Sequence, residues 1–272
     1  MIISVINRSG GRIPDMEVHR VLRAVNRQIA DDFTPYWSLG ATLRLEGSSP
    51  GRPRREHLED MRGDAVLYLC DKLDVDDALG YHDLNHRGVP YGFVFTELSE
   101  RLGEDWSVTL SHEAIELIGD PDVNLLVMGP HPRERGRTVF HWYELCDAVQ
   151  AETYDVDGVA VSNFLLPLYF TGGDEIGGRN DFLGRVHADG PLRSFGVAPG
   201  GYVGFFDPKT RDMGTVEADA EAARRQVEKS RAGLARRGIR YARFRTDEAG
   251  RARPPRGRPA PAPAPAAARR AR

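Results

Sequence analysis

Cysteine is scarce in this chain of 272 residues, which contains only Cys70 and Cys146, far apart and without Cys-x-x-Cys spacing. The scarcity excludes a disulfide framework and a zinc site made of cysteines, and we expect both thiols to be buried. The sequence also has no apolar run of the roughly 18 residues that a membrane-spanning helix needs. Its N-terminus, MIISVINRSG, lacks the features of a signal peptide. We therefore expect a cytoplasmic protein without a membrane partner.

Acidic residues are missing from the C-terminal segment 251–272, which contains seven arginines among alternating prolines and alanines. The whole chain has a formal net charge of −3, so setting aside those seven positive charges leaves −10 for residues 1–250. Segment 247–272 offers nothing that could anchor it in a core, and we expect a disordered Pro/Ala/Arg tail. Nucleic acid would bind only weakly, through this tail, because the acidic body repels it.

The rest of the chain, with 40% hydrophobic residues overall, has the composition of a globular body. Its apolar spacing predicts strands and one helix in mixed order. Strands are predicted at 2–7, 41–46, 65–70 and 88–96, and a helix at 15–33. Pro90, near the start of the last of these strands, favours a place at the edge of a sheet.

The stretch TLSHEAIELIGDPD, residues 109–122, carries charge in the middle of an apolar helical pattern. His112 and Glu116 are four residues apart, so they stand on one helix face and could converge on a single ion. Glu113 lies beside that face, where its carboxylate could take a proton from water as a general base. Charge inside a packed helix needs a partner, and a metal ion would supply it.

This pattern resembles the active-site helix of the zincin superfamily of metallopeptidases, whose motif is H-E-x-x-H. Here it reads H-E-x-x-E, because Glu116 stands where the second histidine is usual. The order of elements up to about residue 120 is also similar. Gly119 and Asp122 lie where the longer motif of the metzincins has its glycine and its third metal ligand. The resemblance implies a zincin-like α+β fold, a mixed sheet with an active-site helix, and Glu113 as general base.

Two candidates for a third ligand remain open, Glu144 and Asp122. Glu144 lies in VFHWYELCDAVQ, residues 139–150, three residues before Asp147. The glutamate-type zincins have a similar pair, in which a glutamate binds the metal and a nearby acid orients the first histidine. We prefer Glu144, assign Asp147 a supporting role as acceptor of a hydrogen bond from His112, and expect Asp120 either to support the site or to cap backbone amides in its turn.

The resemblance also implies that an edge strand binds an extended peptide or protein substrate by backbone hydrogen bonds. The candidate is GVPYGFVFT, residues 88–96, with His82 close before it. The predicted substrate-binding residues are Gly88, Val89, Pro90, Tyr91, Gly92, Phe93 and His82. Neither His131 nor His141 receives a role.

A site with one histidine and two carboxylates would neutralise a divalent zinc ion and weaken its power to acidify water. Oxygen ligands also make manganese or iron possible in place of zinc. The sequence predicts a metal-dependent peptidase with His112, Glu116 and Glu144 as ligands. The alternative is a catalytically inactive protein that keeps the zincin fold for binding or interaction.

The second half of the chain is predicted to form a mixed C-terminal subdomain. Asp157-Gly158 between two alternating runs predicts a hairpin, residues 201–206 a strand, and residues 215–238 a helix. No methionine lies between Met128 and Met213, so the methionine turn of the metzincins is either missing or replaced by another segment, for which residues 162–170 are the candidate. The predicted domain covers residues 1–246, with subdomains 1–122 and 123–246, and the tail follows at 247–272.

Overall fold

The computed structural model describes residues 1–48, 63–71, 82–84, 89–173 and 177–224. The predicted tail lies outside this part of the chain, as does Gly88 of the predicted substrate strand. Within the described residues, no helix has both the length and the apolar character that crossing a membrane requires.

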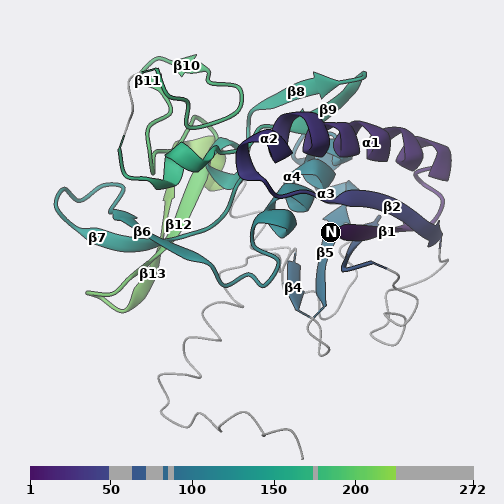
Figure 1. Ribbon diagram of the computed structural model, residues 1–272, viewed down its shortest axis with the longest axis horizontal. Helices are drawn as coiled ribbons and strands as arrows, with labels where there is room; N and C mark the ends of the chain where they lie inside the picture. The colour runs from purple at the N-terminus through teal and green to yellow at the C-terminus, as the bar shows by residue number, and fades with distance from the viewer. Residues whose placement is uncertain (49–62, 72–81, 85–88, 174–176, 225–272) are drawn as a thin grey trace, which may run out of the picture.

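The larger sheet has five strands in a mostly parallel arrangement (Figure 1). Their spatial order is β2 (Thr42–Ser48), β1 (Ile2–Arg8), β3 (Ala65–Cys70), β5 (Pro90–Phe95) and β4 (His82–Leu84). β1, β2, β3 and β5 are parallel, whereas β4 pairs with β5 in the antiparallel sense. β3 is buried along its whole length, which explains its unbroken apolar sequence.

The prediction that the strand beginning near Pro90 lies at the edge of the sheet is wrong. β5 pairs with β3 on one side and with β4 on the other, so β4 is the outer strand on this side of the described sheet. Pro90 is tolerated because it is the first residue of β5, a position at which strands accept proline.

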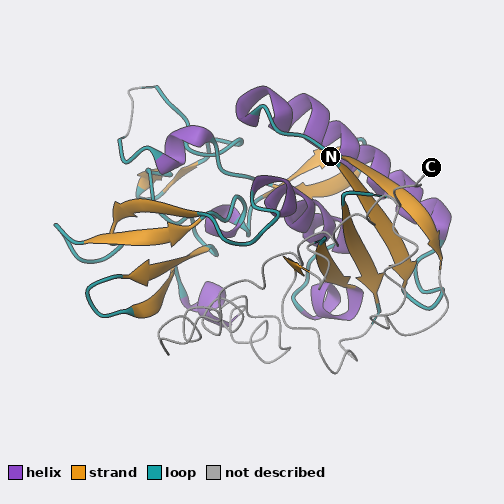
Figure 2. Cartoon of the chain, turned by 60° about the horizontal axis from the view of Figure 1, so that its bottom comes forward, coloured by secondary structure: helices purple, strands orange, loops and turns teal. Residues whose placement is uncertain are grey.

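The main helices pack on one face of this sheet (Figures 1 and 2). The helical elements of this half are α1 (Asp15–Arg27), a π-helical turn η1 (Gln28–Phe33), α2 (Thr34–Trp37), α3 (Thr96–Arg101) and α4 (Trp106–Gly119). The helix predicted over 15–33 is therefore present, with a π-helical end. Alternate residues of the strands join apolar residues of both long helices in one core, which includes Val5, Leu67, Leu22, Val25, Leu110 and Leu117.

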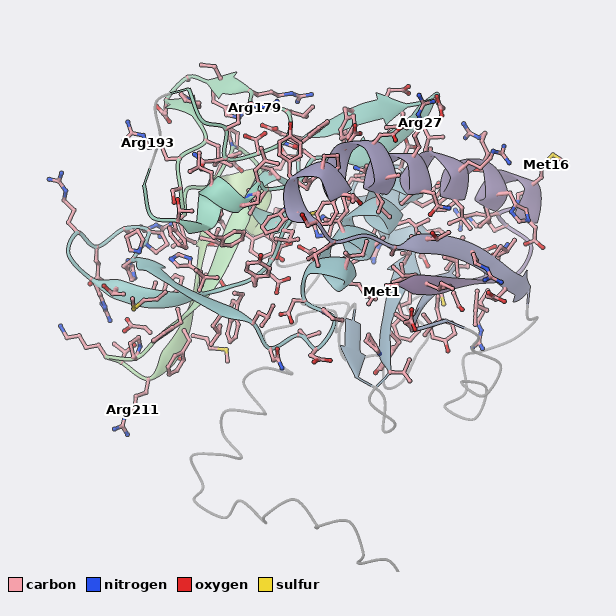
Figure 3. All side chains as sticks on the ribbon, in the orientation of Figure 1. Met1, Met16, Arg27, Arg179, Arg193 and Arg211 are labelled. Atoms are coloured by element: carbon pink, nitrogen blue, oxygen red, sulfur yellow. The ribbon has the colours of Figure 1, made fainter. Side chains whose placement is uncertain are left out.

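A hairpin of β8 (Thr153–Val156) and β9 (Val159–Ser162) covers α4 from another side. Its turn residues Asp157 and Gly158 both have positive φ, as the predicted two-residue turn requires. Arg27 of α1 reaches Asp157 at 2.9 Å (Figure 3). Small polar residues of α4 let the hairpin approach, since Ser111 Oγ accepts a hydrogen bond from the backbone N–H of Ser162 at 2.7 Å.

The second half of the molecule contains an antiparallel sheet in the order β13, β12, β7, β6 (Figure 2). Its strands are β6 (Leu126–Pro130), β7 (Thr138–Trp142), β12 (Tyr202–Asp207) and β13 (Asp212–Glu217). The strand predicted at 201–206 is confirmed as β12. The helix predicted from residue 215 is wrong at its start, because residues 212–217 pair with β12 and this pairing outweighs their helix propensity. After β13, the described part of the chain becomes helical only at Ala220.

Short elements and buried polar contacts precede and follow the hairpin of β8 and β9 along the chain. The short elements are η3 (Asp147–Val149), η4 (Pro167–Phe170), β10 (Val186–His187) and β11 (Gly190–Pro191). The side-chain amide of Asn163 donates to Glu152 at 2.7 Å and to Asp181 at 2.8 Å. The architecture is thus mixed α and β, with a mostly parallel sheet and separate antiparallel sheets.

Candidate metal centre

Helix α4 is buried along almost its whole length, from Ser107 to Gly119. It packs against β5 and β9, and its apolar side chains point into the core in several directions. His112, Glu113 and Glu116 are therefore held inside the protein, with exposed fractions of 6%, 3% and 0%. Buried ionisable groups of this kind need charge compensation.

The imidazole of His112 is the centre of this cluster. Its Nε2 lies 3.2 Å from Oε2 of Glu116, one helical turn away, as the sequence spacing predicts. The same nitrogen lies 3.3 Å from Oδ1 of Asp147 and 3.9 Å from Oε1 of Glu113. One nitrogen thus faces three carboxylates.

The carboxylates control the protonation of His112. Burial lowers the pKa of His112, but the charges of Glu116 and Glu113 and the hydrogen bonds to Asp147 and Glu116 outweigh burial and raise it to about 9. Without a metal ion, the imidazole is protonated at neutral pH and supplies positive charge to the cluster. A metal ion bound to Nε2 would replace that proton.

Asp147 does not lie where an acid that only orients His112 by a hydrogen bond would lie. An acid that orients a metal-binding histidine contacts the ring nitrogen that faces away from the metal. Here Asp147 contacts Nε2, which also faces Glu116. The structure therefore places Asp147 among the candidate ligands, beside the point that an ion on His112 would occupy.

Glu144 and Asp147 come from the segment that connects β7 to η3, and both are buried. Among the described residues, two sets of ligand atoms could hold an ion, and the atoms of each set lie within 4.8 Å of one another. The first comprises His112, Glu113 and Glu116, and the second comprises Glu116, Glu144 and Asp147. Glu144 thus lies next to Glu116 in the centre and comes from the irregular segment between β7 and η3.

Gly119 lets this segment approach α4. A Cβ atom at position 119 would overlap with Cδ1 of Leu145. The segment is also fixed by the backbone N–H of Cys146, which donates to Oε1 of Glu116 at 3.3 Å. Burial raises the pKa of the Cys146 thiol well above its usual value, so the thiol is neutral. Both cysteines are free and buried, as predicted.

We predict that Gly119→Ala destabilises the protein by about 1–3 kcal/mol, because the new methyl group must displace the buried Leu145. Displacing Leu145 also moves Glu144 and Cys146, so metal affinity should fall as well. Denaturant unfolding and metal titration measure the two effects. Gly173→Ala is the matched control, since a Cβ there has no neighbour within 4 Å, and equal results for both variants would contradict the prediction.

The remaining acids predicted for the site lie outside its centre. The carboxylate of Asp120 accepts hydrogen bonds from the backbone N–H groups of Asn124 at 3.1 Å and Leu125 at 3.0 Å, so it caps the turn after α4. Asp122 is exposed and belongs to neither set of ligand atoms. Between the two proposed third ligands, the structure brings Glu144 to the centre and not Asp122.

Part of the predicted substrate strand is already paired within the sheet and is closed to a peptide. Val89 lies next to β5; Pro90, Tyr91 and Gly92 pair with β4 on the outer side, and Tyr91, Gly92 and Phe93 pair with β3 on the other. Phe93 is buried, and its ring stacks on Tyr68 at 5.2 Å. His82 begins β4, the outer strand. An extended peptide could therefore pair with β4 and not with β5, which corrects the expected position.

A pocket beside the carboxylates contains residues that the sequence did not single out. It is lined by His141, Trp142, Glu144, Asp147, Ala148, Tyr169, Tyr202, Val203 and Gly204. Burial lowers the pKa of His141, so its imidazole is neutral at pH 7. These residues come from β7, η3, η4 and β12, and no spacing in the sequence indicates that they meet.

Comparisons of this chain with models of protein families, with curated proteins and with solved structures find no match. The feature that bears most directly on function is therefore the cluster of buried histidine and acidic residues positioned to hold a metal ion.

Proposed function

We propose that this protein is a metal-dependent peptidase with a zincin-like fold. The proposal rests on one observation, the single nitrogen of His112 that faces the carboxylates of Glu116 and Asp147 within 3.3 Å inside the protein. Glu113, the next residue along α4, lies 3.9 Å from the same nitrogen. Ligands and base are thus supplied from one helix and one neighbouring segment.

The residues present fit a divalent cation. One imidazole nitrogen and several carboxylate oxygens match the ligands that zinc accepts, with manganese or iron as alternatives for an oxygen-rich set. His112 and Glu116 would hold the ion, and the segment of Glu144 and Asp147 would supply the third ligand. A bound ion would polarise the substrate carbonyl and acidify water.

Glu113 is the residue that we assign to proton transfer. Its carboxylate is buried within the ligand cluster, so it can accept a proton from the attacking water and pass it to the leaving amine. Low exposure also keeps bulk water from competing for this carboxylate. His112 and Glu116 then act as ligands and take no part in proton transfer.

The arrangement of elements supports the zincin-like reading. The motif helix α4 packs on a mostly parallel sheet whose outer strand β4 runs antiparallel to its neighbour. An extended peptide or protein substrate would pair with β4 through backbone hydrogen bonds, which makes binding tolerant of sequence. The substrate would then lie along the sheet that carries the site.

A peptide mixture tests this function. Protein loaded with zinc should cleave unstructured peptides of varied sequence, and cleavage should stop on chelation and return when zinc is added back. Mass spectrometry identifies the products. Metal binding without any cleavage would overturn the peptidase assignment and favour the alternative, an inactive protein that uses the fold for binding, for which the acid-rich ligand set is the supporting observation.

We predict that metal binding at pH 7.5 releases about one proton from His112, since its pKa of about 9 keeps it protonated until an ion takes its place. Affinity should therefore fall about tenfold for each pH unit below 9. Calorimetric titration in two buffers with different ionisation enthalpies measures the proton count. His19, on the surface of α1, provides the control His19→Ala, which should leave the count unchanged. A count near zero in the wild type would contradict the prediction.

A further inference from the structure

Glu116 belongs to both sets of ligand atoms in the centre. The first set contains His112 and Glu113, and the second contains Glu144 and Asp147. All five residues are buried. Since the two sets share Glu116, they allow two neighbouring positions for a cation, with Glu116 between them.

The charge of the carboxylates also favours two cation positions. The two sets together contain four carboxylates and one imidazole. One divalent ion would balance two carboxylates, whereas two divalent ions would balance all four. Cations bound by carboxylates offset the cost of holding those groups away from water, so the full set suits two divalent ions.

His141 gives an independent indication of a ligand next to the second set. Its Nε2 lies 2.8 Å from the carbonyl oxygen of Pro130, a hydrogen-bond acceptor, so Nε2 carries the proton and Nδ1 is left with a lone pair. Nδ1 is buried and has no hydrogen-bond partner. His141 lines the pocket that also contains Glu144 and Asp147, and in β7 it pairs with Phe205, on the sheet face of Val203. A buried nitrogen lone pair accepts a hydrogen bond or binds a cation, so a cation on this side of the pocket would give Nδ1 a partner, directly or through a water molecule.

A second cluster of buried acids in the described residues differs from the candidate metal centre. Glu152 and Asp181 share the amide of Asn163, and Glu152 also contacts Nε2 of His187 at 2.7 Å. Protein side chains contact those acids, and the oxygens of Glu152 and Asp181 belong to neither of the sets of converging ligand atoms. The centre at Glu116 differs, because its ligand atoms converge.

We propose that the centre binds two divalent cations, with Glu116 as the bridging ligand, Glu144 as a ligand of the second ion alone, and Asp147 between the two. This inference rests on the proposed metal site for the first ion. Two-metal sites hold their ions about 3.5–4 Å apart and stabilise both the attacking and the leaving group of a hydrolysis. The second ion would lie on the pocket side, next to His141, where it could bind a carbonyl or terminal group of the substrate.

Manganese provides the test, because two close Mn²⁺ ions couple magnetically and a single ion does not. Metal-free protein is titrated with Mn²⁺, and the bound ions are counted by equilibrium dialysis with elemental analysis and observed by electron paramagnetic resonance. We expect two ions per wild-type chain with a spin-coupled spectrum. Glu144→Gln should bind one ion with an uncoupled spectrum, and Asp122→Asn, an exposed acid outside the centre, should bind two.

The outcomes separate the two levels of the account. One uncoupled ion in the wild type would overturn the second site and leave the proposed function intact. No bound ion would overturn both. One ion in the wild type whose affinity falls in Glu144→Gln would make Glu144 the third ligand of a single ion and would also overturn the inference. Circular dichroism of each variant confirms that the count refers to folded protein.

Discussion

Glu113→Gln is expected to lower the rate of peptide cleavage by about 10²–10⁴, the range for loss of a general acid or base. Glutamine has the same shape and remains buried in α4, but its amide cannot accept a proton from water at neutral pH. His112 and Glu116 are untouched, so the variant should still bind metal. The measurement is initial cleavage rate together with metal content, at equal protein concentration.

The matched control for Glu113→Gln is Asp122→Asn, which also replaces a carboxylate by an amide close to α4 but at an exposed position. It should cleave at the wild-type rate. A Glu113→Gln variant that cleaves as fast as the wild type would remove Glu113 from the chemistry. Loss of metal together with loss of cleavage would instead make Glu113 a ligand, as its place in the first set of ligand atoms allows.

Glu116→Gln is expected to abolish the stabilisation that metal confers on the protein. A ligand at a hundred times its Kd stabilises the folded state by about 2.7 kcal/mol. Glu116 belongs to both sets of ligand atoms, so its loss should leave no binding at that concentration. The measurement is the free energy of unfolding with and without zinc, in the wild type and in the variant.

The metal-free Glu116→Gln protein should fold but be less stable than the wild type, because it loses the ion pair between Glu116 and protonated His112. The amide oxygen can still accept the hydrogen bond from Cys146 N–H, and one negative charge is removed from beside Glu113 and Asp147. Equal stabilisation by zinc in both proteins would show that zinc binds elsewhere. A variant that is unfolded without metal would show that Glu116 holds the structure together as an acid.

Local spacing was enough to predict the part of the site that lies on one helix. His112 and Glu116 meet because residues four apart share a face of a helix, and Glu113 follows directly. The segment of Glu144 and Asp147 was recognisable as acids among apolar residues. Their role was harder to predict, because it depends on which nitrogen of His112 the carboxylate of Asp147 reaches, and only packing decides that.

Long-range pairing explains the errors. By itself Pro90 indicates a strand at the edge of a sheet. It is the first residue of β5, however, and β4 adds a strand outside it. Residues 215–217 favour a helix locally but are pulled into β13 by pairing with β12. His141 has no motif around it, because it meets Glu144 and Tyr169 only in the folded chain, where all three line one pocket.

Gly119 shows how a motif residue acquires a physical meaning. In the sequence it matches the glycine of a longer metallopeptidase motif. In the structure its missing side chain makes room for Leu145, so that Glu144 can lie close to Glu116. The requirement is close approach of two segments, since Gly119 is not among the glycines with positive φ.

Metal content per chain tests the central claim most directly. Wild-type protein and His112→Ala are purified side by side without added metal and measured by elemental analysis. We expect at least one zinc, manganese or iron ion per wild-type chain and none in His112→Ala. A wild type that carries no metal, and binds none when zinc or manganese is supplied, would contradict it.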